Sequence, residues 1–231
     1  TTGQYNVAIG YDAGTALVGG THNVIIGDSA GIATTTVDKA VIIGQAAGAG
    51  VLTAAADGTI VIGVEAGNRI TSGAGNLAIG YQCMDALTVG ELNTAVGYGA
   101  LGTSVDGSYN AAFGYQALEV FEAGSNAGEN TALGYRAGRY ISTGVSNTFV
   151  GSQSGQAIIG TPSVGINNTA VGKNALMVIQ SGDYNTTLGS RSGDALTTGS
   201  KNIFIGDYAG SSTVVAGLCT IIGWSACGDG V

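Results

Sequence analysis

The sequence predicts an all-β protein, a parallel β-solenoid in which each coil is one copy of a short repeat. A glycine preceded by two apolar residues recurs along the whole chain, and most steps between these glycines span about 17 residues. The chain of 231 residues includes 42 glycines and only one proline, yet neither the three-residue period of collagen nor the 3.6-residue period of helices persists. A fixed step of this length indicates a solenoid of stacked coils.

The recurring glycine, here called the anchor, defines thirteen coils. A step of about 17 residues accommodates two short extended segments and two turns, which favours a flattened two-sided β-roll. We therefore predict a single repeat array over residues 1–231, with the last coil, 219–231, as a candidate cap to which Trp224 contributes. The anchors are Gly10, Gly27, Gly44, Gly63, Gly80, Gly97, Gly114, Gly134, Gly151, Gly172, Gly189, Gly206 and Gly223.

The two residues before each anchor predict a short strand that is buried on both faces. The residue directly before the anchor, from Ile9 to Ile222, is apolar in every coil, and we predict that it fills the interior of its own coil. The residue one position earlier points to the opposite face and is apolar in every coil but one, so we expect another chain to cover it. An alternative is that the small members of this column only pad a tight coil. The predicted interface column is Ala8, Ile25, Ile42, Val61, Ala78, Ala95, Ala112, Ala132, Phe149, Ala170, Phe204 and Ile221.

Asparagine lies four residues before the anchor in ten coils, and a glycine precedes most of these asparagines by three positions. Glycine and asparagine supply positive backbone dihedral angles in tight turns, and stacked amides can form a ladder from coil to coil. The coils that end at Gly44 and Gly63 carry Ala40 and Thr59 instead. The third residue after the anchor is small in nearly every coil, and Cys83 occupies this column as a small buried thiol.

Three longer steps between anchors place inserted loops at residues 49–58, 119–129 and 156–166. Insertions in solenoids are displaced to the surface, often on the binding side. A tyrosine also follows the anchor in four successive coils, so these rings are expected to stack in a file. Two roles are open for these rings: packing against one another between coils, or contact with a receptor. The candidate receptor-contact residues are Tyr81, Tyr98, Tyr115, Tyr135, Glu119, Glu122 and Glu129.

Composition argues against several classes of function. The formal net charge is −8 and the seven Lys and Arg residues are scattered, so we expect no nucleic-acid partner. The sequence contains no apolar run of about 18 residues, so we expect no membrane-inserted segment. The single histidine, His22, and three cysteines without metal spacing predict no metal site or cofactor. Cys219 and Cys227 flank the last anchor, which leaves open whether they pair.

A glycine pattern at residues 97–102 matches a dinucleotide-binding fingerprint but lies in register with the repeat, and no helix pattern follows it. We assign it no function. No other set of catalytic residues emerges, so we do not predict an enzyme.

The phrases at residues 93–101 (NTAVGYGAL) and 130–138 (NTALGYRAG) resemble the repeats of trimeric fibre proteins. Similar runs occur in phage and phage-like tail fibres and in bacterial fibrous adhesins, and a shorter related pattern builds the heads of trimeric autotransporter adhesins. The resemblance covers nearly the whole chain. It implies a homotrimer of parallel β-rolls with left-handed coils, located extracellularly on a cell surface or virion fibre.

The leading functional hypothesis is therefore a structural and receptor-recognition segment, the head or tip of such a fibre, which binds a cell-surface glycan or protein receptor. One alternative is a tailspike-like glycan depolymerase that uses carboxylates of the inserted loops. A further alternative is an ice-binding solenoid. Its threonines belong to a strand that we predict to be buried, which argues against it; they are Thr94, Thr131, Thr148, Thr169 and Thr186.

Overall fold

The protein folds into two compact units, and each is a parallel β-solenoid. The computed structural model describes residues 3–121, 128–161 and 163–227. The first unit contains the described residues up to Asn110, and the second contains those from Ala111 onward. That residues 1–231 form a single repeat array stays a prediction.

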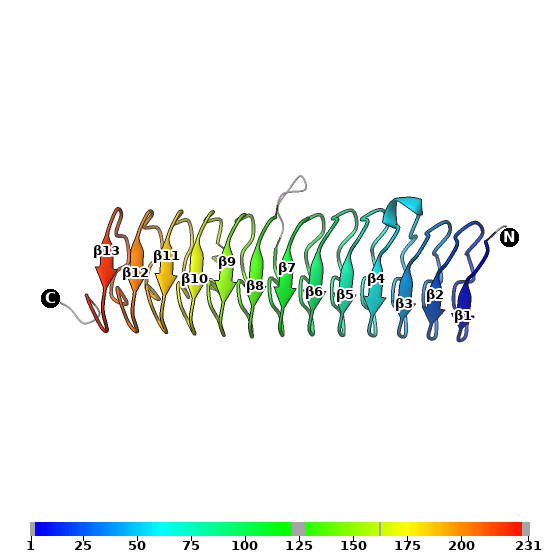
Figure 1. Ribbon diagram of the computed structural model, residues 1–231, viewed down its shortest axis with the longest axis horizontal. Helices are drawn as coiled ribbons and strands as arrows, with labels where there is room; N and C mark the ends of the chain where they lie inside the picture. The colour runs from blue at the N-terminus through cyan, green and yellow to red at the C-terminus, as the bar shows by residue number, and fades with distance from the viewer. Residues whose placement is uncertain (1–2, 122–127, 162, 228–231) are drawn as a thin grey trace. The chain divides into compact units, whose positions relative to one another are not determined.

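Each coil contributes one strand of three residues, which ends directly before the anchor glycine (Figure 1). Within each unit the strands pair in chain order, parallel and in register, so that Ala8 pairs with Ile25 one repeat later. The first unit contains β1 (Val7–Ile9), β2 (Val24–Ile26), β3 (Val41–Ile43), β4 (Ile60–Ile62), β5 (Leu77–Ile79) and β6 (Thr94–Val96). The second contains β7 (Ala111–Phe113), β8 (Thr131–Leu133), β9 (Thr148–Val150), β10 (Thr169–Val171), β11 (Thr186–Leu188), β12 (Ile203–Ile205) and β13 (Thr220–Ile222). The all-β class, the parallel solenoid and the predicted repeat length are confirmed.

The anchor glycine ends each strand because its backbone conformation is strained for a residue with a Cβ atom. The anchors have φ between 128° and 140°, a region that residues with a Cβ atom rarely adopt. The anchors of adjacent coils also lie in contact. A Cβ atom added to Gly172 would lie 2.3 Å from the carbonyl oxygen of Gly189. The periodic glycine is therefore required both by its dihedral angle and by the close stacking of the coils.

The segment after the anchor is not the second extended segment that we predicted. The second and fourth residues after the anchor are left-handed, as in Asn174 (φ 58°) and Leu176 (φ 51°). Such residues interrupt an extended chain, so this side of the coil consists of turns. Backbone hydrogen bonds still join these turns between coils, as from the amide of Asn174 to the carbonyl of Ser152 at 2.9 Å.

The middle residue of each strand points into the coil, which reverses our assignment of the two strand faces. Residues directly before the anchor lie on the outer face and are partly exposed; Ile9, Leu133 and Ile222 are at least half exposed. The interface assignment is wrong for eleven of the twelve predicted residues, because the single chain already buries them. They are Ile25, Ile42, Val61, Ala78, Ala95, Ala112, Ala132, Phe149, Ala170, Phe204 and Ile221. The twelfth, Ala8, belongs to β1, whose three residues are exposed.

Complementary side-chain volumes fill this interior. The fourth residue after the anchor is glycine where the neighbouring strand residue is large, since a Cβ atom on Gly155 would lie 2.2 Å from the ring of Phe149. In the coils of Ala78 and Ala170 it is a large buried residue, Met84 and Leu176. In the coil of Ala132 it is Gly138, where a Cβ atom would lie 2.9 Å from the ring of Phe149 in the next coil. Alanine in the strand column therefore accommodates a large partner within its own coil, as the alternative interpretation proposed.

The asparagine column forms the predicted ladder inside the coils. The Oδ1 atom of Asn76 accepts hydrogen bonds from the backbone amide and the Nδ2 atom of Asn93, at 3.0 and 3.1 Å. The Nδ2 atom of Asn93 also donates to the carbonyl of Gly107 at 2.8 Å. The glycine three residues earlier has no positive φ, contrary to our turn prediction. It is required because a Cβ atom on Gly90 would lie 2.2 Å from that same carbonyl oxygen.

Near the first inserted loop, where asparagine is missing, other hydrogen bonds take the place of the asparagine ladder. This loop contains a short 3₁₀ helix, η1 (Ala54–Ala56), and follows the coil in which Ala40 occupies the asparagine position. Ala40 has no side-chain oxygen that could accept a hydrogen bond from the next coil. The backbone amide of Thr59 therefore donates to the carbonyl of Ala56, at 3.3 Å. The Oγ1 atom of Thr59 donates to the carbonyl of Gly73 at 3.2 Å, as an asparagine would.

The end of the described chain provides no evidence of a packed cap. Trp224 is 78% exposed, so its ring covers little of the last coil. Cys219 is partly buried, Cys227 is exposed, and both are free thiols. Residues 228–231 of the predicted cap lie outside the described part of the chain.

Candidate receptor-binding site

The predicted tyrosine file forms stacked pairs on the surface. In the first unit, the rings of Tyr81 and Tyr98 lie 5.1 Å apart between centroids, with planes inclined by 23°. In the second unit, the corresponding values for Tyr115 and Tyr135 are 5.4 Å and 13°. The ring-packing interpretation is thus confirmed. Each of the four side chains nevertheless remains 40–47% exposed, so the pairs still present aromatic surface.

The three predicted loop acids have different surroundings. Glu119 forms an ion pair with Arg139, and its Oε1 atom accepts a hydrogen bond from Gln116 at 2.7 Å. Glu129 accepts a hydrogen bond from the exposed hydroxyl of Ser146 at 3.1 Å. Glu122 lies outside the described residues. The structure therefore shows Glu119 as part of a polar network with Arg139 and Gln116.

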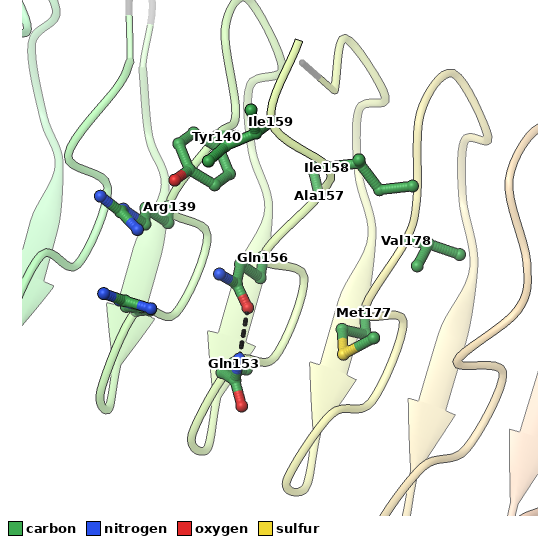
Figure 2. Close-up of a pocket in the computed structure, with 10 residues that line it drawn as sticks. Arg139, Tyr140, Gln153, Gln156, Ala157, Ile158, Ile159, Met177 and Val178 are labelled. Carbon is green, nitrogen blue, oxygen red and sulfur yellow. Dashed lines mark hydrogen bonds between the residues drawn. The ribbon is translucent and has the colours of Figure 1, made fainter. Parts of the chain in front are cut away.

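A cavity that the sequence did not predict lies beside the third inserted loop, within the second unit. Its volume is about 280 Å³. It is lined by side chains of three successive coils and of the insertion itself (Figure 2). The polar side is formed by Arg136, Arg139, Tyr140, Gln153 and Gln156, and the apolar side by Ala157, Ile158, Ile159, Met177 and Val178.

Both arginines of this cavity are held in place by neighbouring groups. The Nε atom of Arg136 donates to the side chain of the buried Gln116 at 3.1 Å, and its guanidinium carbon lies 4.9 Å from the ring centre of Tyr135. Arg139 is paired with Glu119 and lies 4.7 Å from the ring centre of Tyr140. The partners Gln116 and Glu119 belong to the preceding coil, so these contacts orient both guanidinium groups toward that coil.

The next coil continues the polar wall with amides. Gln153 and Gln156 occupy the repeat positions of Arg136 and Arg139 one coil later, and the Nε2 atom of Gln153 donates to the Oε1 atom of Gln156 at 2.8 Å (Figure 2). Beyond them, Met177 and Val178 close the cavity with apolar surface. The cavity thus combines amide and apolar groups in a small space, with the arginine side chains at one edge.

Burial raises the pKa of three groups outside this cavity. Burial raises the pKa of the Cys83 thiol to about 12, so it is not a thiolate near neutral pH. Burial also raises the pKa of Asp85 and of Asp194, opposed most by the charges of Arg69 and Arg191. Within residues 3–121, 128–161 and 163–227, no group of three or more His, Cys, Asp or Glu residues could hold a metal ion. No helix in those ranges is long and apolar enough to cross a membrane.

Comparison with known proteins does not assign this chain to a family. No protein-family model, no curated protein and no solved structure matches it. The resemblance to trimeric fibre repeats therefore stays a prediction from the sequence.

Proposed function

We propose that this chain is a structural and receptor-recognition segment of a homotrimeric surface or virion fibre, and that its subunits associate through the outer face of the strands. One observation carries the proposal: each unit presents an apolar outer sheet face in addition to a filled interior. The repeat resemblance adds the trimeric state, the left-handed coils and the extracellular location.

The outer sheet face consists of the first and third residues of every strand. In the first unit it is formed almost entirely by Val, Ile and Leu, from Val7 to Val96, and these side chains are partly exposed. In the second unit a file of Val, Leu, Ile and Phe runs beside a file rich in threonine. A soluble monomer rarely exposes a contiguous apolar patch of this extent. Two more copies of the same chain, each with the same face, would cover it.

A charge on this face is expected to prevent association. Val171 is the third residue of β10 and lies on the outer face. Val171→Asp would place three carboxylates in the proposed interface, at a cost on the order of several kcal/mol for each unpaired buried charge. We expect the variant to sediment as a monomer with an unchanged circular dichroism spectrum. Val214→Asp is the matched control, because Val214 is half exposed but lies in a turn outside the strands, and it should remain trimeric. Trimeric Val171→Asp would contradict the proposed interface.

The second part of the proposal assigns receptor contact, with a cell-surface glycan as the expected ligand, to the tyrosine pairs and inserted loops. Flat, half-exposed rings such as Tyr115 and Tyr135 present apolar faces and hydroxyl groups that suit sugar rings. A glycan array probed with the full chain tests this. Replacing both tyrosines by alanine should weaken the bound signal about tenfold or more, whereas Tyr184→Ala, an exposed tyrosine outside these pairs, should not.

Unchanged glycan binding of the double variant would show that the two tyrosines do not contact the glycan. Release of shorter oligomers from host polysaccharide would instead indicate the depolymerase alternative.

The exposed threonines favour ice binding as a second candidate function. The sequence predicts these threonines on a buried strand, whereas in the structure they lie on the outer face and are partly exposed. Four of them pair in register over successive coils of the second unit, about 4.8 Å apart; they are Thr131, Thr148, Thr169 and Thr186. This function requires the face to be free of other subunits. A monomer that shows thermal hysteresis on freezing would support it, and the absence of hysteresis would exclude it.

A further inference from the structure

Two turn edges flank the outer sheet face of every coil. The leading edge is formed by the sixth and fifth residues before the anchor, such as Lys201, and the trailing edge by the first and second residues after it, such as Asp207. In this coil the strand β12 lies between the two edges. The edges therefore border opposite sides of the face that we propose as the subunit interface.

In the second unit the two edges carry complementary charges. The coils of β8, β11 and β12 have a charged residue on both edges, and the two signs are opposite in each coil. The pairs, leading edge first, are Glu129 with Arg136, Asp183 with Arg191, and Lys201 with Asp207. All six residues are partly or fully exposed, and none forms an ion pair with another described residue of its own chain. The inference is confined to this unit, because Asp57 and Glu65 give the two edges of β4 the same charge.

A cyclic trimer joined through the outer sheet face brings opposite edges together. The three subunits are related by rotation alone, so subunits whose solenoid axes run along the three-fold axis hold the same coil at the same height. The contact around the ring is heterologous, and the trailing edge of one subunit meets the leading edge of the next. Residues that one chain keeps apart, such as Lys201 and Asp207, then face each other across every groove between subunits.

The same charges disfavour subunits that are out of register. A shift of one coil, about 4.8 Å, only exchanges one apolar strand for another on the outer face, so hydrophobic contact distinguishes the two registers weakly. In one direction the shift brings Arg191 beside Lys201 of the neighbouring subunit, and in the other it brings Asp207 beside Asp183. Both contacts join like charges, which repel each other.

We propose that ion pairs between subunits, with Lys201 of one chain facing Asp207 of the next, set the register in which the chains associate. This inference rests on the proposed trimer and adds the residues that select its alignment. The apolar face supplies the association, and the charged edges of β8, β11 and β12 hold equivalent coils level. The tyrosine pairs lie on the trailing edge, so the proposed receptor site borders the groove between two subunits.

Charge reversal in the full chain tests the pair of Lys201 and Asp207, with the trimer dissociation constant measured by sedimentation equilibrium over a dilution and urea series. Lys201→Asp and Asp207→Lys should each weaken the trimer about tenfold or more, because three contacts in one trimer become repulsive. The double variant, which exchanges the two charges, should return to within about threefold of the unmodified chain. Asp207→Lys is decisive, since it lowers the net negative charge and would tighten the trimer if only overall repulsion mattered.

Lys173→Asp is the matched control. It makes the same change of charge as Lys201→Asp, but the leading edge of its coil carries the uncharged Ile166 and Asn167. Its dissociation constant should stay within about threefold of the unmodified chain. Circular dichroism checks that each variant folds. If a reversal misfolds, Lys201→Gln and Asp207→Asn replace it, and each should weaken the trimer about threefold.

Three results would each overturn the inference. They are an unchanged or tighter trimer in Asp207→Lys, or in Asp207→Asn where it replaces the reversal, a double variant no tighter than either single variant, and a loss in Lys173→Asp equal to that in Lys201→Asp. Any of these in a chain that is itself trimeric leaves the proposed trimer standing. A monomeric unmodified chain would overturn the proposed trimer and this inference together.

Discussion

Replacing Gly172 by alanine is expected to unfold the second unit or to destabilise it by more than about 4 kcal/mol. Two effects add at this position. The φ angle of 138° is unfavourable for any residue with a Cβ atom, and that atom would lie 2.3 Å from the carbonyl oxygen of Gly189. The adjacent coils would have to separate, which breaks the hydrogen bonds between β10 and β11. Thermal unfolding followed by circular dichroism measures the loss.

Two glycine controls separate these effects. Gly223 is the last anchor and has a similar φ of 128°, but among the described residues a Cβ atom there meets nothing closer than 3.8 Å. Gly223→Ala should therefore show only the dihedral strain, about 1–3 kcal/mol. Gly217 has no positive φ and a nearest atom at 3.6 Å, so Gly217→Ala should change stability little. If Gly172→Ala were no worse than Gly223→Ala, the contact between stacked anchors would not be the reason for the glycine repeat.

Asn185→Ala is expected to destabilise the second unit by about 3–5 kcal/mol, since it removes several hydrogen bonds and leaves buried groups unpaired. The Nδ2 atom of Asn185 donates to Asn168 and to the carbonyl of Gly199, at 3.0 and 2.8 Å. Its Oδ1 atom accepts from the backbone amide and side chain of Asn202, at 3.1 and 2.9 Å. Chemical denaturation monitored by circular dichroism gives the free energy of unfolding.

Asn174→Ala is the control for this measurement. The Oδ1 atom of Asn174 is buried without a hydrogen-bond partner among the described residues. Alanine also occurs at the same left-handed repeat position in Ala46, so the backbone tolerates it. We expect a loss of no more than about 1 kcal/mol. Equal losses for Asn174→Ala and Asn185→Ala would contradict the ladder as a main source of stability.

Most of the fold could be predicted because the residues that determine each coil recur at fixed positions of the repeat. The anchor glycines mark the end of every strand, the asparagine column predicts the ladder, and the longer steps predict the inserted loops. The predicted second extended segment was wrong because left-handed residues there are mostly not glycine. Met84 (φ 52°) and Leu118 (φ 48°) are examples, and neither indicates a turn by residue type.

The two strand faces could not be separated from hydrophobicity alone, because both carry apolar residues. Volume gives a signal that was available in the sequence. Phe149 and Phe204 precede glycine at the fourth position after the next anchor, whereas Ala78 and Ala95 precede Met84 and Leu101. Residues whose sizes compensate in this way must share one interior. This signal identifies the middle strand column as the core and the column before the anchor as the outer face.

The candidate site was predictable only in part. The tyrosine file and the inserted loops follow from their repeat positions, and Glu119 was singled out on one of these loops. Arg136 and Arg139 were not singled out. Their positions in the sequence do not indicate that a loop of the following coil forms a cavity beside them. The pairing of Arg139 with Glu119 joins neighbouring coils, and only the stacking of the repeats brings these residues together.

Sedimentation equilibrium of the unmodified chain tests most directly the central claim that the outer sheet face joins three subunits. One chain has a mass of 22.6 kDa. We expect a species of three times that mass over the micromolar range, and we expect Val171→Asp to dissociate it to single chains. A stable monomer of the unmodified chain, with its outer face exposed to water, would contradict the account.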